Sequence, residues 1–179
     1  SKEYAERIHR TARSSADLIE RVGDLVSTLE QQDKPTPRSL EDVLTAVVSD
    51  ARDQYEPLTV DFDPDAFDYR VYGGELLDSV FTNIITNAAA HNDGEVRVRL
   101  DVVTANGSEV VVSIADDGSG IPPEMEDRLF EMGAKGPDSD GTGFGLGFVK
   151  ALTESYGGDI SVADSEWSGA DFRVTLDQA

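Results

Sequence analysis

Residues 116–124 read DDGSGIPPE, and residues 141–148 read GTGFGLGF. The first stretch directly follows a predicted strand at 109–115, so Asp116 is expected at the end of that strand. A carboxylate in that position can accept a hydrogen bond from an exocyclic amine. Gly118 and Gly120 would let a flat ring approach the backbone, because neither carries a side chain. Taken alone, the same residues also fit a tight turn before a helix that begins with proline.

The second stretch opens a predicted helix, where a glycine-rich backbone and the helix N-terminus favour anions such as phosphate. Gly143 and Gly145 do not follow a strand, which disfavours a dinucleotide-binding Rossmann turn. A third feature is the pair Asn83 and Asn87, which share one face of another predicted helix. Their amide oxygens are suitable neutral ligands for Mg²⁺. Such pairs are also common as surface or capping residues.

Outward from these stretches, apolar periodicity predicts an alternation of helices and strands. Ser39 is a predicted N-cap with Asp42 in the capping-box position, and Asn106-Gly107 is a predicted hairpin turn. The plan is an α+β two-layer sandwich, a mixed β-sheet with helices on one face. Helices are expected at about 39–54, 74–92 and 146–156, and strands at 58–62, 96–103, 109–115, 159–163 and 171–176.

The N-terminal region is predicted to be one long heptad-repeat helix over residues 2–32, with a seam that runs from Ala5 to Leu29. Such a helix needs a second helix or a second chain, or else it lies on its own domain. Two prolines then predict a linker. The expected domains are 1–33, a linker at 34–38, and 39–179. Because the sequence begins with serine, we expect a piece of a longer protein.

The composition excludes several classes of function. The net charge of −21 repels nucleic acids and anionic lipid. Acidity combined with only 4 lysines among 15 basic residues predicts a halophilic archaeon as the source. Without cysteine there are no disulfides or thiolate metal sites, and two histidines make a zinc site improbable. No apolar run spans a membrane, so this part is expected to be cytoplasmic, whereas the longer protein could be membrane-attached.

Taken together and in this order, the stretches resemble the catalytic and ATP-binding domain of sensor histidine kinases, within the superfamily that includes gyrase, Hsp90 and MutL. IITNAAAHN looks like the Asn box, DDGSGIP the first glycine box, RLFEMGAKG the Phe box, and GTGFGLGFVKALTESYGGDISV the second glycine box with the strand after it. The resemblance covers residues 39–176. Residues 1–32 then resemble the second helix of the dimerisation and histidine-phosphotransfer hairpin.

The resemblance implies roles for individual residues. Asn83 and Asn87 would be catalytic, and Asn87 would bind Mg²⁺. Asp116 would read the adenine amino group. Ala90 stands where many members carry a basic residue, which leaves Lys135 as a candidate counter-charge for phosphate. The residues expected to contact ATP are Asn87, His91, Asp116, Gly118, Gly120, Ile121, Phe130, Lys135, Gly141, Thr142, Gly143, Phe144, Gly145 and Leu146.

By this resemblance the chain uses ATP and Mg²⁺ and transfers the γ-phosphate to a histidine on a dimerisation helix outside it. The implied partners are a response-regulator receiver domain and a second copy of the protein, joined through the N-terminal helix. His9 lacks the acidic neighbour usual for an acceptor. A gyrase-type ATP hydrolase is disfavoured because Asn83 replaces a catalytic glutamate, and the heptad helix disfavours an anti-sigma-type serine kinase. A degenerate module that binds nucleotide or a partner without phosphotransfer is the alternative.

Overall fold

The computed structural model describes residues 2–3, 5–6, 33–55, 57–90, 94–131 and 145–179. Most of the predicted helix over residues 2–32 therefore lies outside the described residues. In chain order the described elements are β1 (Thr36–Ser39), α2 (Leu40–Gln54), β2 (Leu58–Asp61), η1 (Pro64–Phe67), β3 (Arg70–Gly73), α3 (Leu77–Ala90), β4 (Val96–Ala105), β5 (Glu109–Asp116), η2 (Pro123–Met125), α4 (Gly145–Ser155), β6 (Asp159–Asp164) and β7 (Ala170–Asp177).

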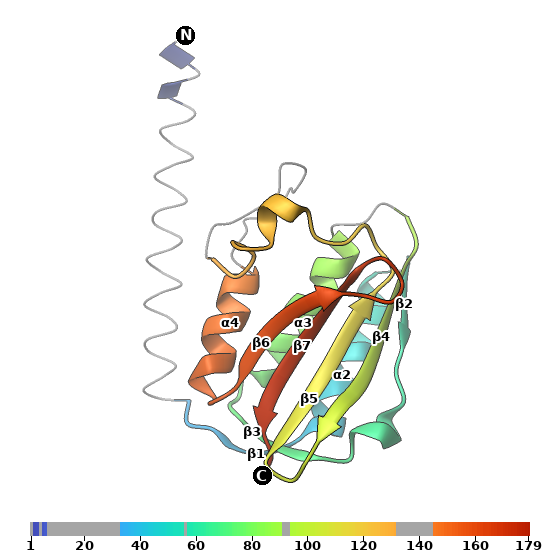
Figure 1. Cartoon of the computed structure of the whole chain (residues 1–179). Coiled ribbons are helices and arrows are strands. Elements are labelled where there is room, and N and C mark those ends of the chain that lie inside the picture. The colour runs from blue at the N-terminus through green and yellow to red at the C-terminus, as the bar shows by residue number, and fades with distance from the viewer. Residues whose placement is uncertain (1, 4, 7–32, 56, 91–93, 132–144) are drawn as a thin grey trace.

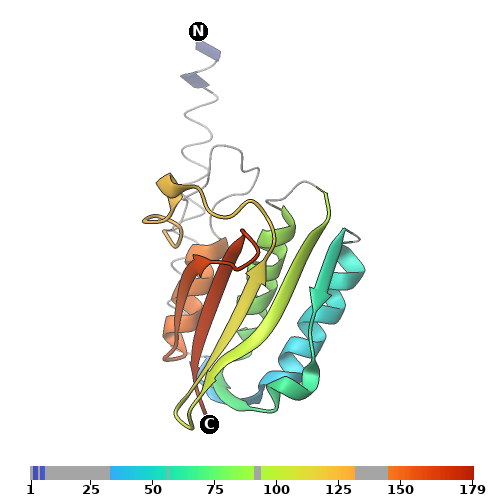
Figure 2. The ribbon, with the colours of Figure 1, turned by 45° about the vertical axis from the view of Figure 1, so that its right-hand side comes forward.

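Five strands form the main sheet in the order β2-β4-β5-β7-β6. The β2 and β4 strands are parallel, and the other neighbours are antiparallel, so the sheet is mixed. Helices α2, α3 and α4 cover one face of this sheet, and the other face is left open (Figure 1; Figure 2). The predicted two-layer α+β sandwich is confirmed. No helix within the described ranges has the length and apolar character needed to cross a bilayer.

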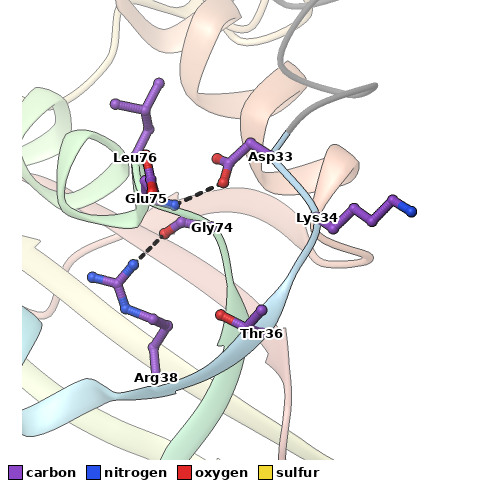
Figure 3. Close-up of a pocket in the computed structure, with 7 residues that line it drawn as sticks. All are labelled: Asp33, Lys34, Thr36, Arg38, Gly74, Glu75 and Leu76. Atoms are coloured by element: carbon purple, nitrogen blue, oxygen red, sulfur yellow. Dashed lines mark hydrogen bonds between the residues drawn. The ribbon is translucent and has the colours of Figure 1, made fainter.

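A second, two-stranded sheet was not predicted. Strand β1 pairs antiparallel with β3, with Thr36 opposite Gly73. Within the predicted linker at 34–38, Thr36 to Arg38 lie in this strand. Pro37 fits there because the strand lies at an edge, where its missing N–H breaks no inner ladder. Nη1 of Arg38 donates a hydrogen bond of 2.9 Å to the carbonyl oxygen of Gly74, the residue that directly follows β3 (Figure 3). The division into domains stays a prediction.

Two local predictions about helix and turn chemistry are confirmed. The side chain of Ser39 caps α2, since its Oγ accepts a hydrogen bond of 3.2 Å from the backbone N–H of Asp42. Between β4 and β5, Oδ1 of Asn106 accepts hydrogen bonds from the N–H groups of Ser108 and Glu109. Gly107 in this turn has a φ of 87°, which favours glycine. Helix α3 begins at Leu77, three residues later than expected.

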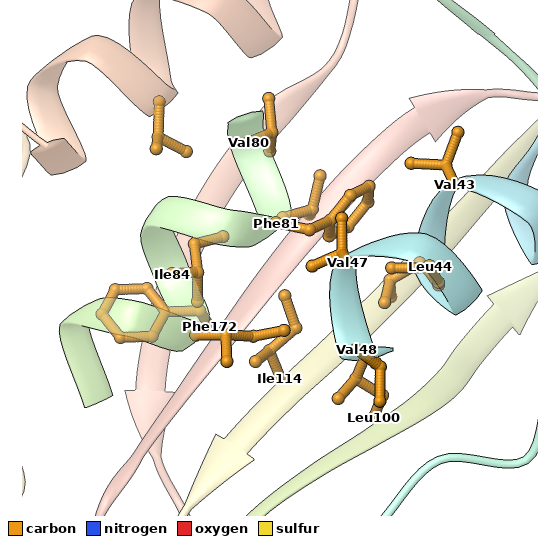
Figure 4. Close-up of a cluster of buried hydrophobic side chains, with 14 of the residues drawn as sticks. Val43, Leu44, Val47, Val48, Val80, Phe81, Ile84, Leu100, Ile114 and Phe172 are labelled. Carbon is orange, nitrogen blue, oxygen red and sulfur yellow. The ribbon is translucent and has the colours of Figure 1, made fainter. Parts of the chain in front are cut away.

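The core lies between the three helices and the sheet (Figure 4). Apolar residues at helical spacing on α2 and α3 meet the inward residues of β4, β5 and β7. Burial of each large side chain stabilises the fold by about 1.5–3 kcal/mol. Because the apolar stripe of α3 faces the sheet, its asparagines are left at the margin of the stripe. Central members of this core are Val43, Leu44, Val47, Val48, Val80, Phe81, Ile84, Leu100, Ile114 and Phe172.

Candidate nucleotide site

The carboxylate of Asp116 lies at the end of β5 and is buried, with 6% of the residue exposed. Its Oδ1 atom accepts two backbone hydrogen bonds, one from Gly118 at 2.9 Å and one from Ala170 at 3.3 Å. Both donors bind the same oxygen, so the plane and orientation of the carboxylate are fixed. This is the strand-end position that the sequence predicts for Asp116.

Burial raises the pKa of Asp116 above its usual value, because removal from water disfavours the charged form. The hydrogen bonds from Gly118 and Ala170 act in the opposite direction, and the charge of Asp117 adds to the upward shift. An acid that remains buried in this way needs a hydrogen-bond donor to offset the cost of its charge.

The glycines after Asp116 shape the backbone beside it. Gly120 has a φ of 77°, in the left-handed region that favours glycine. A Cβ atom there would also lie 3.2 Å from the carbonyl oxygen of Ser168. Gly118 and Ile121 are half-buried, and Ile121 packs against the core. The loop thus passes close to the turn between β6 and β7.

That turn supplies two residues that the sequence analysis missed. A Cβ atom on Gly169 would overlap the carbonyl oxygen and Oδ1 of Asp116, so the close approach requires glycine. The next residue, Ala170, donates its N–H to the same carboxylate. The only sequence signal was a glycine directly before the last strand, which by itself indicates nothing about a partner 53 residues earlier. Gly169 and Ala170 therefore belong to the candidate site.

The two predicted asparagines lie on α3, and both are half-buried. Nδ2 of Asn83 donates a hydrogen bond of 2.6 Å to the carbonyl oxygen of Ser79, which fixes its amide group. A Cβ atom on Gly145, the first residue of α4, would lie 3.5 Å from Oδ1 of Asn83. The structure therefore brings the asparagine face of α3 to the N-terminus of α4. Leu146, the second residue of α4, is buried.

Phe130 lies after η2 and is half-buried. Its ring meets Phe172 of β7 edge to face, with centroids 6.4 Å apart. Nζ of Lys150, on α4, lies 5.5 Å from the centre of the same ring and also pairs with Glu154 at 3.3 Å. The segment that carries Phe130 is thus fixed to both the sheet and α4, close to where α4 begins.

The described parts of the candidate site gather at one end of the molecule. The C-terminal ends of β5 and α3, the N-terminal end of α4 and the η2 segment all lie at the top of Figure 1. The remaining predicted site residues lie outside the described residues. These are His91, Lys135, Gly141, Thr142, Gly143 and Phe144.

The family of the chain follows from comparison with known sequences. A family described as "Histidine kinase-, DNA gyrase B-, and HSP90-like ATPase" matches residues 74–179, more than half of the chain. The chain belongs to this ATPase family. The matched region contains every described residue of the candidate site.

Named relatives within this ATPase family are sensor kinases. The chain is 38% identical over 148 residues to the sensor histidine kinase AruS of Pseudomonas aeruginosa, which covers 78% of this chain and 15% of that protein. It is 35% identical over 145 residues to the two-component sensor PhoQ of the same species, which covers 80% of this chain and 31% of that protein. The chain thus spans less than a third of the length of these relatives.

Solved structures agree with the fold of this ATPase family. The ATP-binding domain of PrrB from Mycobacterium tuberculosis superposes with a TM-score of 0.66 and 25% identity, covering 82% of this chain and 99% of that one. The catalytic domain of histidine kinase ThkA superposes with a TM-score of 0.70, covering 81% of this chain and 98% of that one, at 21% identity. The second likeness shows the fold alone.

Proposed function

We propose that the chain is the ATP-binding catalytic domain of a two-component sensor histidine kinase, which transfers the γ-phosphate of ATP to a histidine on a dimerisation helix outside residues 1–179. The phosphoryl group then passes to an aspartate of a response-regulator receiver domain. The observation that carries the proposal is the fixed, buried carboxylate of Asp116, beside which the backbone passes closely because Gly120 and Gly169 carry no side chain.

The arrangement of Asp116 suits adenine. Its Oδ1 atom is occupied by two backbone donors, Gly118 and Ala170. Oδ2 is therefore the atom assigned to the exocyclic amine of adenine. Guanine presents a carbonyl there, which leaves two acceptors facing each other at a cost of about 1–3 kcal/mol. The site should therefore prefer ATP to GTP.

The phosphates fit the side of the site formed by α3 and α4. Asn87 would hold Mg²⁺ through its amide oxygen, with Asn83 one turn earlier, and the N–H groups at the start of α4 would face the phosphates. When bound, Mg²⁺ neutralises the charge that develops on the transferred phosphoryl group. The protein itself contributes to catalysis by positioning, because α3 and α4 hold the asparagines and Gly145 in a fixed relation to Asp116.

Asn83 favours phosphotransfer over hydrolysis. The gyrase, Hsp90 and MutL enzymes that the chain resembles carry a catalytic glutamate where Asn83 stands. An amide has no basic group to activate water, and Nδ2 of Asn83 is already engaged by Ser79. The competing proposal, a degenerate module that binds nucleotide without transfer, predicts ATP binding with no phosphorylated product.

The wider setting of the domain is also proposed. In this proposal, residues 1–33 are part of the dimerisation hairpin, residues 34–38 are the linker, and residues 39–179 are the catalytic domain. The full-length protein would form a homodimer through the N-terminal helix, with this domain in the cytoplasm. The net charge of −21 disfavours nucleic acid as a partner and supports a halophilic archaeon as the source.

The experiment is phosphotransfer to the isolated histidine-bearing hairpin of the longer protein. With Mg-ATP labelled on the γ-phosphate, the hairpin should acquire acid-labile label, and a hairpin with its histidine changed to glutamine should not. Calorimetry with ATP and GTP on the same preparation tests the adenine assignment. Tight ATP binding without label on the hairpin would favour the degenerate module, and equal affinity for the two nucleotides would refute the role of Asp116.

A further inference from the structure

Asp33 joins three segments that are far apart in the sequence. Its Oδ1 atom accepts a hydrogen bond of 2.9 Å from the backbone N–H of Glu75, two residues before α3 (Figure 3). Its Oδ2 atom accepts a hydrogen bond of 2.7 Å from the hydroxyl of Tyr156, directly after α4. Both oxygens of one carboxylate are therefore engaged by the catalytic domain. Asp33 itself lies ahead of β1, where the chain enters that domain.

The surroundings of Asp33 are shaped to receive it. A Cβ atom on Gly74 would overlap the carboxylate of Asp33, so the fit depends on glycine at that position. The carbonyl oxygen of Gly74 is in turn fixed by Arg38, which belongs to the same entering segment as Asp33. The entering segment thus contacts the start of α3 twice, through one carboxylate and one guanidinium group. Figure 3 shows both hydrogen bonds, with Lys34 directed away from them.

Tyr156 is a permanent donor in this arrangement. The residue is only 2% exposed, and its ring belongs to the core. Burial and the hydrogen bond to Asp33 raise the pKa of its hydroxyl well above the usual value. The hydroxyl therefore stays protonated at neutral pH and can donate its hydrogen bond to Asp33.

We propose that Asp33 is a positioning residue for phosphotransfer, which latches the entering segment to the start of α3 and the end of α4. The latch consists of Asp33, Gly74, Glu75 and Tyr156. It connects the start of α3 and the end of α4, which lie at the end of the molecule opposite the nucleotide site (Figure 1). The proposal rests on the proposed function, because a fixed entry point matters only if an upstream histidine must reach the γ-phosphate.

The physical consequence is a fixed relation between the entry point and the site. Helices α3 and α4 run from the latch to the nucleotide site, where α3 carries Asn87 and α4 begins with Gly145. An acceptor held upstream of Asp33 is therefore placed relative to these residues by the latch and two rigid helices. Transfer depends strongly on such placement, since the reacting atoms must approach within about 3–3.5 Å.

The latch itself is tested by amide hydrogen exchange on the supplied chain. Asp33→Ala should lower the protection of the Glu75 N–H about tenfold or more, and Gly74→Ala should do the same by expelling the carboxylate. Lys34→Ala is the matched control and should leave that protection unchanged. Asp33→Asn should restore it, because an amide can still accept from Glu75 and donate to the oxygen of Tyr156. Unchanged protection in Asp33→Ala would overturn the latch.

The positioning role is tested in the longer kinase. Tyr156→Phe should lower the kcat of histidine phosphorylation about three- to tenfold, as expected for loss of one hydrogen bond, with the KM for ATP unchanged. Asp33→Ala removes two hydrogen bonds and should lower the kcat at least as much, again with the KM for ATP unchanged. The double variant should be no slower than Asp33→Ala, because both changes remove the same contact. Normal kcat in Asp33→Ala would overturn the positioning role. A wild-type protein that transfers no phosphate would instead refute the proposed function and the positioning role together. The hydrogen-exchange experiment would still test the latch independently.

Discussion

Replacing Asp116 with asparagine should separate nucleotide recognition from folding. Two backbone N–H groups hold Oδ1, so the amide oxygen of the asparagine must take that position. Its NH₂ group then occupies the place of Oδ2 and faces the amine of adenine, donor against donor. Loss of a charge-assisted hydrogen bond together with an unpaired donor costs about 2–4 kcal/mol. At about 1.4 kcal/mol for each tenfold change, the Kd for ATP should rise about 30- to 700-fold.

Isothermal calorimetry measures the change, and Asp117→Asn is the matched control. Asp117 is exposed, and its Oδ1 accepts a hydrogen bond of 2.8 Å from the N–H of Arg97, so it loses the same charge without touching the proposed base site. The melting temperature of Asp116→Asn without nucleotide should equal or exceed that of the wild type, because a buried charge has been removed. ATP affinity within twofold of wild type, or an equal loss in the control, would refute the reasoning.

Four further outcomes are expected. Asn87→Ala should abolish Mg²⁺-dependent ATP binding while the circular dichroism spectrum stays native, because asparagine adds nothing to helix stability; an unfolded variant would make Asn87 structural. Burial raises the pKa of Asp116 above its ordinary value of 3.8, so ionisation of Asp116 lowers the stability of the folded protein as the pH rises from 3.8 through the raised pKa. Over that pH range the wild type should therefore lose stability relative to Asp116→Asn. Parallel profiles of stability against pH for the two proteins would contradict this. The melting temperature should rise steeply from dilute buffer to molar KCl, since a net charge of −21 repels itself; a flat profile would remove the halophile proposal. The chain should bind Mg-ATP without labelling itself, and acid-labile label that disappears in His9→Gln would make His9 the acceptor.

The layers and the main elements could be predicted because they depend on local patterns. The apolar stripe of α2 and the alternation in β4 are each contained in one segment of sequence. Asp116 was found for the same reason, since a strand that ends in DDGSG is a local signal. The capping role of Ser39 is local too, and it was predicted correctly.

What could not be predicted depends on contacts between distant segments. Strands β1 and β3 have four residues each, and β1 contains Pro37, so neither has a readable alternation. Gly169 and Ala170 reach Asp116 only because β7 pairs with β5. Asp33 is one of 36 acidic residues, and nothing in the sequence distinguishes it from the others. Its role becomes visible only in the folded chain, where Tyr156 and Glu75 donate hydrogen bonds to it.

The position of β7 has a consequence for how the protein is made. It is the last strand of the domain to leave the ribosome, yet it lies inside the sheet, between β5 and β6. Until it is available, β5 has an open edge and Asp116 lacks the N–H of Ala170. A nascent chain that stops before residue 170 therefore exposes a strand edge that invites pairing with other chains. The domain is expected to gain its nucleotide site and its protection from aggregation in one late step of synthesis.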